Sequence, residues 1–232
     1  MTAPEFSFDL APYRLSGAVY GALLNDPLQL AALGDALHSA PYKAPPAHPV
    51  LSVKPRNTLA EDGAAVVVPQ GVDGLEMGAS LGIVIGRTAC RVAQQSALDV
   101  VAGYVIVNDI SVAQTGNARH YRPGVRHRAR DGFCPIGSQV IAAGMVRNPD
   151  ALAVRVYLDG MLVHESSTAG RTRSVARLIA DVSEFMTLQP GDLLLLGAAH
   201  DAPLARAGQA VLIEIEGLGQ LAHRLVAEPV RP

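Results

Sequence analysis

Apolar residues alternate with polar ones, or gather in short runs, along most of the chain beyond residue 49. Alternation and short apolar runs are typical of strands that are buried on one or both faces. We expect strands at residues 50–53, 64–69, 81–86, 103–109, 138–143, 152–166, 192–197, 210–217 and 220–226. Within residues 152–166, Asp159-Gly160 separates two apolar-rich halves, and this pair predicts a hairpin turn.

Helical periodicity is confined to a few segments. Residues 25–40 carry leucines at helical spacing behind Asp26, a candidate N-cap, and Pro27, which suits the first helical position. Residues 174–192 carry an apolar stripe that begins after Ser174 and stops at Pro190-Gly191, and residues 94–104 suggest a short third helix. Many strands with few helices predict an α+β fold.

A proline-rich stretch at residues 40–50 suggests the domain organisation. We expect an N-terminal extension with one helix at residues 1–44 and one β-rich domain at residues 45–232. Apolar residues make up 49% of the 232, which is enough for a sizeable core, and the net charge of −2 argues against nucleic acid as a partner.

The chain lacks the features of a membrane or secreted protein. No apolar run approaches the roughly 20 residues of a membrane helix, and the first residues lack a basic leader. Cys90 and Cys134 are too few for a disulfide framework, and nothing in the sequence supports their pairing. We therefore expect a soluble protein of the reducing cytoplasm.

Gly78-Ala79-Ser80-Leu81-Gly82 reads as G-x-S-x-G, the nucleophile elbow of α/β-hydrolases. An elbow needs a buried strand before the serine and a helix after it. Here a loop-like segment precedes Ser80 and a strand-like one follows it, so the order is inverted. We do not expect Ser80 to be a nucleophile.

Several motifs carry a family resemblance. "VLSVKPRNTL" at 50–59, "LGIVIGR" at 81–87, "DVVAGYVIVND" at 99–109 and "RDGFCPIG" at 130–137 follow one another in order. In this combination the chain resembles the fumarylacetoacetate hydrolase superfamily from about Pro45 to its end. The resemblance implies a mixed β-roll or sandwich with a few short helices.

The finer resemblance is to the N-terminal half of a branch that acts in homoprotocatechuate (4-hydroxyphenylacetate) catabolism. It implies an oxo di- or tricarboxylate substrate, 5-oxopent-3-ene-1,2,5-tricarboxylate, which is decarboxylated and whose product, 2-hydroxyhepta-2,4-diene-1,7-dioate, is isomerised. Family members hold Mg²⁺ or another divalent cation through an E-x-E pair and the aspartate of N-D. Such a cation stabilises an enolate as a Lewis acid.

This chain departs from the family at the metal and at the acid/base pair. Counting back from Gly86, the E-x-E positions read Gly78 and Ser80, so Asp109 alone remains of three carboxylates. We expect it to bind a metal weakly or not at all. Asn-Asp after a strand is also a common structural step. The family's lid histidine and glutamate read Gln29 and Ala32, and neither side chain transfers protons near neutral pH.

The remaining candidate residues suit an anion. The resemblance assigns catalytic roles to Lys54, Asp109 and Asp131, and substrate binding to Arg56, Tyr121, Arg122 and Arg128. Guanidinium groups bind carboxylates bidentately, although a solvated basic face is the plainer interpretation of the same arginines. If residues 125–131 form a strand, Arg126, Arg128 and Arg130 share one face. His120 and His127 are the best-placed general bases, and the other histidines show no ligand spacing.

Three functional hypotheses follow. The first is a decarboxylase/isomerase subunit that forms a homo-oligomer, or a hetero-oligomer with a metal-complete homologous subunit. The second is an oxo-diacid hydrolase or tautomerase of the same superfamily that acts alone. The third is a non-catalytic structural or regulatory subunit, which the missing acid/base and metal groups make a serious alternative to the first.

Overall fold

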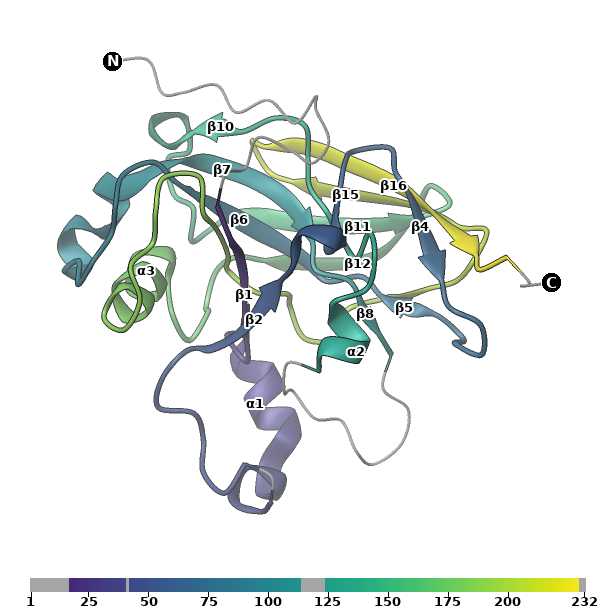
Figure 1. Ribbon diagram of the computed structural model, residues 1–232, viewed down its shortest axis with the longest axis horizontal. Coiled ribbons are helices and arrows are strands. Elements are labelled where there is room, and N and C mark those ends of the chain that lie inside the picture. The colour runs from purple at the N-terminus through teal and green to yellow at the C-terminus, as the bar shows by residue number, and fades with distance from the viewer. Residues whose placement is uncertain (1–16, 41, 114–123, 230–232) are drawn as a thin grey trace.

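The computed structural model of the protein describes residues 17–40, 42–113 and 124–229. Two sheets dominate it, and both are mostly antiparallel (Figure 1). The six-stranded sheet has the order β10-β7-β6-β13-β1-β2, and its only parallel pair among the described residues is β1 with β13. Its strands are β1 (Val19–Leu23), β2 (Val50–Lys54), β6 (Ala79–Ile85), β7 (Val101–Asn108), β10 (Ile141–Ala142) and β13 (Leu193–Leu195).

The five-stranded sheet has the order β12-β11-β15-β16-β4. It contains β4 (Ala65–Val68), β11 (Ala153–Leu158), β12 (Met161–Ser167), β15 (Ala210–Ile215) and β16 (Gly219–Ala227). The predicted hairpin at Asp159-Gly160 is confirmed, because it joins β11 to β12. Short ladders complete the fold, namely β14 (Leu204–Ala205), β5 (Leu75–Glu76) and β8 (Ser111–Val112) in one sheet, and β3 (Leu59–Ala60) with β9 (Cys134–Pro135) in another.

Helices are few and short, so the predicted α+β class is confirmed. They are α1 (Pro27–Leu33), α2 (Val125–Arg128) and α3 (Val175–Ser183), with 3₁₀ turns at Gly34–His38, Arg56–Thr58, Gln94–Val100 and Ala143–Met145. Asp26 caps α1 by accepting from the Leu28 N–H, and Ser174 caps α3, as predicted. The expected third helix is only the 3₁₀ turn at Gln94–Val100. None of the described helices has the length and apolar character needed to cross a bilayer.

Two parts of the structure differ from the sequence expectations. The segment expected as an N-terminal extension contributes β1, which lies between β13 and β2 in the larger sheet. Residues 125–128 form α2 and not a strand. The prediction that Arg126, Arg128 and Arg130 share one face of a strand is therefore wrong. Three arginines at alternate positions imitate strand periodicity, but a single helical turn begins after Gly124.

The core lies between the two large sheets and continues behind the larger one. β7 is buried on both faces, because Tyr104 and Ile106 belong to the main cluster whereas Val105 and Val107 belong to a second, smaller cluster. α3 packs its apolar face into the main cluster, while α1 projects from the body beside β2 (Figure 1). β7 ends at Asn108. Asn108 and the next residue, Asp109, therefore lie where side chains can reach both apolar clusters.

Candidate functional site

Three predicted residues form a buried ionic cluster at the end of β7. Lys54 Nζ lies 2.6 Å from Asp109 Oδ1, and Arg128 Nη1 lies 3.1 Å from Asp109 Oδ2. The side chains of Lys54 and Asp109 are 0% and 3% exposed, and that of Arg128 is 19% exposed. Lys54 Nζ also donates to the Arg128 carbonyl at 3.2 Å. We call Lys54, Asp109 and Arg128 the ionic cluster.

Local structure explains why this cluster can be buried. β2 alternates so that Ser52 and Lys54 point inward while Val53 is exposed. Asp109 fits over β1 because residue 21 is glycine, where an added Cβ would lie 3.1 Å from Asp109 Oδ2. Burial by itself raises the pKa of Asp109, but the charges of Lys54 and Arg128 outweigh it and hold that pKa below its usual range. Asp109 is therefore ionised at neutral pH.

The other predicted site residues are not part of this cluster. Arg56 is exposed at the 3₁₀ turn after β2, and exposed Asp131 accepts a 2.7 Å hydrogen bond from Asn57 Nδ2. His127 lies half-buried on α2. The predictions for Tyr121, Arg122 and His120 fall outside the described residues.

Gly78 and Ser80, which the resemblance placed at the family's glutamate positions, have structural roles. The Asp109 N–H donates to the Gly78 carbonyl at 2.9 Å, and a Cβ added at Gly78 would lie 2.3 Å from the Asp109 carbonyl oxygen. Buried Ser80 Oγ accepts from the Gly197 N–H at 3.0 Å and donates to the Leu81 carbonyl at 3.3 Å. Ser80 is the second residue of β6, a fully buried strand, so no elbow exists here.

These residues do not fit a divalent cation. Hard cations take several oxygen ligands, and carboxylates supply most of the charge. No group of three or more His, Cys, Asp or Glu side chains suited to a metal occurs within the described residues. Asp109 is the one acidic side chain of the ionic cluster, and its two oxygens face an ammonium and a guanidinium.

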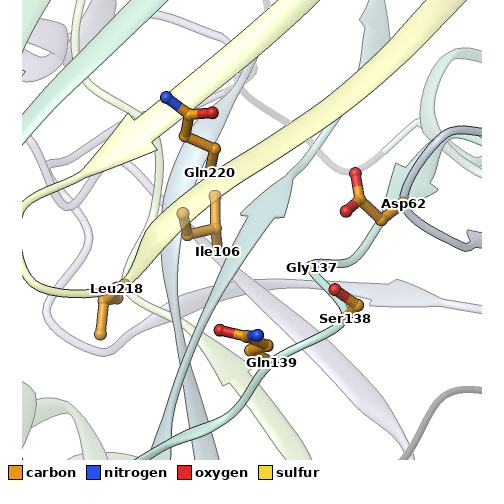
Figure 2. Close-up of a pocket in the computed structure, with 7 residues that line it drawn as sticks. All are labelled: Asp62, Ile106, Gly137, Ser138, Gln139, Leu218 and Gln220. Carbon is orange, nitrogen blue, oxygen red and sulfur yellow. The ribbon is translucent and has the colours of Figure 1, made fainter.

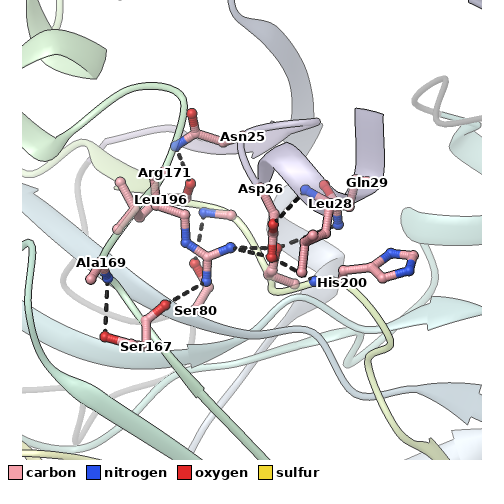
Figure 3. A network of polar contacts seen from close by, with 12 residues as sticks. Asn25, Asp26, Leu28, Gln29, Ser80, Ser167, Ala169, Arg171, Leu196 and His200 are labelled. Atoms are coloured by element: carbon pink, nitrogen blue, oxygen red, sulfur yellow. Dashed lines mark hydrogen bonds and ion pairs between the residues drawn. The ribbon is translucent and has the colours of Figure 1, made fainter. Parts of the chain in front are cut away.

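The start of α1, where the resemblance placed the family's lid residues, is held by a polar network around Asp26 (Figure 3). Asp26 Oδ2 accepts from Arg171 Nη1 at 2.9 Å and from the His200 N–H at 2.8 Å. Gln29 Nε2 reaches the Ala198 carbonyl at 3.4 Å, and Arg171 donates to the same oxygen. The start of α1 is thus tied to residues 198–200 by contacts that fix its position.

Sequence reasoning missed one buried pair beside the cluster. Asn108 Nδ2 lies 2.8 Å from His223 Nε2, which comes from β16 in the opposite sheet. Asn108 Oδ1 and His223 Nδ1 are buried and have no hydrogen-bond partner among the described residues. The signal was available, because Leu221, His223 and Leu225 alternate along β16 and the two leucines face the core.

A separate cavity of about 260 Å³ opens near the β15–β16 turn (Figure 2). Its lining residues are Asp62, Ile106, Gly137, Ser138, Gln139, Leu218 and Gln220. None of them belongs to the ionic cluster. The Asp62 carboxylate also has a structural role, because it accepts from the Ala222 N–H at 2.8 Å. We assign no chemistry to this cavity.

Comparisons with known proteins agree with this fold. The chain is 36% identical over 214 residues to the 4-hydroxyphenylacetate degradation bifunctional isomerase/decarboxylase of Escherichia coli. The match covers 92% of this chain and 48% of that protein, so the chain spans about half the length of this curated relative. A crystal structure of 2-hydroxyhepta-2,4-diene-1,7-dioate isomerase from Mycobacterium marinum is 26% identical with a TM-score of 0.73, covering 93% of this chain and 77% of that one.

Fumarylpyruvate hydrolase from Pseudomonas aeruginosa, solved with Mn²⁺ and pyruvate, shares the fold with a TM-score of 0.76. It is 22% identical and the match covers 98% of this chain and 97% of that one. A divalent cation is thus found in a protein of this fold, although the described residues here do not fit one. The family described as fumarylacetoacetate (FAA) hydrolase C-terminal matches residues 18–226. This chain belongs to the fumarylacetoacetate hydrolase family.

Proposed function

We propose that this chain is one subunit of a 5-oxopent-3-ene-1,2,5-tricarboxylate decarboxylase and 2-hydroxyhepta-2,4-diene-1,7-dioate isomerase of homoprotocatechuate catabolism. The observation that carries the proposal is the ionic cluster, in which two cations surround one carboxylate at a buried strand end. The identity to a bifunctional isomerase/decarboxylase supports the choice of reaction. The match covers 48% of that relative, which leaves room for a second unit that shares the work.

The chemistry of the reaction explains why positive charge is needed. Loss of CO₂ leaves an electron pair on the substrate, and the substrate stores it as an enolate conjugated with the 2-oxo acid. Fixed cations in a site that excludes water stabilise such developing charge. Lys54 and Arg128 are held in place by Asp109, so they need little rearrangement to meet an anionic ligand.

The proton transfers of the isomerisation need a second unit. Gln29 and Ala32 carry no group that titrates near neutral pH, and the described residues do not fit a metal. A metal-complete homologous subunit would supply the acid/base groups and the divalent cation. The proposed assembly is therefore a hetero-oligomer, or a fused pair of homologous halves, and its ligand is an oxo di- or tricarboxylate.

The test is a decarboxylation assay with the purified chain, its metal-complete homologue and Mg²⁺. We expect CO₂ release from the tricarboxylate to be slow or absent with this chain alone. The rate of CO₂ release by the mixture should exceed the sum of the rates of the two separate proteins. No gain on mixing would refute the subunit role. Full activity of the single chain, lost in Asp109→Asn, would show instead that it acts alone.

The second candidate function is a non-catalytic subunit that stabilises or regulates the metal-complete one. Gln29 and Ala32 favour it, because both proton-transfer groups of the family's lid are absent. The same mixing assay separates the two candidates when it is repeated with Arg128→Gln. A catalytic or substrate-binding role predicts lower activity of the mixture, whereas a purely structural role predicts unchanged activity.

A further inference from the structure

The ionic cluster carries more positive than negative charge. Lys54 and Arg128 supply two positive charges, and Asp109, whose pKa is held low, supplies one negative charge. No other acidic side chain of the described residues contacts either cation. Residues 114–123, which precede α2 in the sequence, include two arginines and no acidic residue. A buried excess charge is costly unless a counter-ion is present.

A divalent cation cannot be that missing partner. Mg²⁺ binds oxygen at about 2.1 Å, so an ion on Asp109 Oδ1 could lie no farther than about 4.7 Å from Lys54 Nζ. At this separation in a buried site, the repulsion between two cations is strong. Gly78 cannot carry a second carboxylate without backbone movement, since its added Cβ would lie 2.3 Å from the Asp109 carbonyl oxygen.

An anion finds suitable donors at the same place. Arg128 uses Nη1 for Asp109, and its Nε and Nη2 groups have no partner among the described residues. A guanidinium can hold one carboxylate through one edge and still present parallel N–H groups to another. The Arg128 side chain is the most exposed of the three, so a ligand can reach it from solvent, and buried Lys54 supplies a second positive charge.

We propose that the ionic cluster binds the carboxylate of a 2-oxo acid directly, without a divalent cation. Lys54 and Arg128 supply the positive charge that a metal ion would otherwise bring, and Asp109 positions both of them. The proposal rests on the proposed function for the choice of a 2-oxo acid. It differs from that function in one respect, since it concerns binding by this chain alone.

The experiment is calorimetric titration of the purified full-length chain with pyruvate and with oxalate, its planar dicarboxylate analogue. Each titration is done in excess EDTA and again in excess Mg²⁺. We expect the affinity to be the same, within about twofold, in both buffers. Arg128→Gln should weaken binding by about tenfold or more, the effect of losing hydrogen bonds between charged groups. Arg128→Lys keeps the charge without the paired donors, so its affinity should lie between those of the wild type and Arg128→Gln.

Arg155→Gln is the matched control, because Arg155 is half exposed on β11 and pairs with Glu165 far along the other sheet. It should bind the ligands as the wild type does. Thermal unfolding of each variant shows that the comparison is made between folded proteins. Binding that requires Mg²⁺, or that survives in Arg128→Gln, would overturn the proposal. Either result is independent of whether the chain and a partner decarboxylate the tricarboxylate.

Discussion

Acidification is expected to weaken the fold through His223. This side chain is 2% exposed between the two sheets, and its one hydrogen-bond partner among the described residues is the neutral Asn108 amide. Burial lowers the pKa of His223 from 6.5 to about 4. No carboxylate within the described part of the chain pairs with this imidazole, so the folded state keeps the neutral form.

The sign and size of the effect follow from this pKa. Between pH 6.5 and about 4, the unfolded chain binds a proton at this histidine that the folded chain does not bind. The stability that depends on neutral His223 is therefore complete above pH 6.5 and decreases as the pH falls. One pKa unit corresponds to about 1.4 kcal/mol, so the loss from pH 7.5 to 4.5 is about 2.5 kcal/mol.

The assay is urea unfolding at several pH values between 4.5 and 7.5, for the wild type and His223→Gln. Glutamine keeps an amide that can bond Asn108 but does not titrate. The variant should be less stable at pH 7.5 and should lose about 2.5 kcal/mol less on acidification. Other titrating groups, such as Asp150, whose pKa burial raises, cancel in this comparison. His38→Gln, at an exposed site, is the control. Parallel pH profiles for the wild type and His223→Gln would refute the reasoning.

Two further predictions concern buried side chains. Ser80→Ala should lower the free energy of unfolding by about 1–3 kcal/mol, because the Gly197 N–H then lacks its acceptor; denaturant unfolding measures this, and an unchanged midpoint would contradict it. Cys90 is exposed and Cys134 is buried, with a pKa that burial raises to about 12. A thiol reagent should therefore modify Cys90 quickly in the native protein and Cys134 only after unfolding. Fast modification of both cysteines would show that the apolar cluster around Cys134 is open to solvent.

The sequence predicted those strands that are long enough to show a clear alternation of apolar and polar residues. Strands such as Ala210–Ile215 and Gly219–Ala227 alternate over six or nine residues, so the face buried in the core could be read directly. β1 was missed because its five residues, with Gly21 in the middle, show no clear alternation. Two-residue ladders such as Leu59–Ala60 with Cys134–Pro135 carry no period at all and form only when tertiary packing brings them together.

The sequence could name three residues that come together in the ionic cluster, but it could not give their arrangement. Motif order identified Lys54, Asp109 and Arg128, and strand alternation could have shown that Lys54 is buried. Lys54 and Asp109 are 55 residues apart in the sequence, and Asp109 and Arg128 are 19 apart. No local sequence pattern predicts contacts between residues so far apart. The sequence also could not show that Gly78 lies against the backbone of Asp109, since that close approach depends on the pairing of β6 with β7.

Asn108 and Asp109 are neighbours in the sequence, but their side chains make contacts in different parts of the structure. Neighbouring residues at a strand end point to opposite faces, so the two side chains enter different clusters. Asn108 reaches across the main core to His223 in the smaller sheet, while Asp109 turns to Lys54 beside the second cluster. A single peptide bond therefore separates the residue that binds His223 from the residue that binds Lys54 and Arg128.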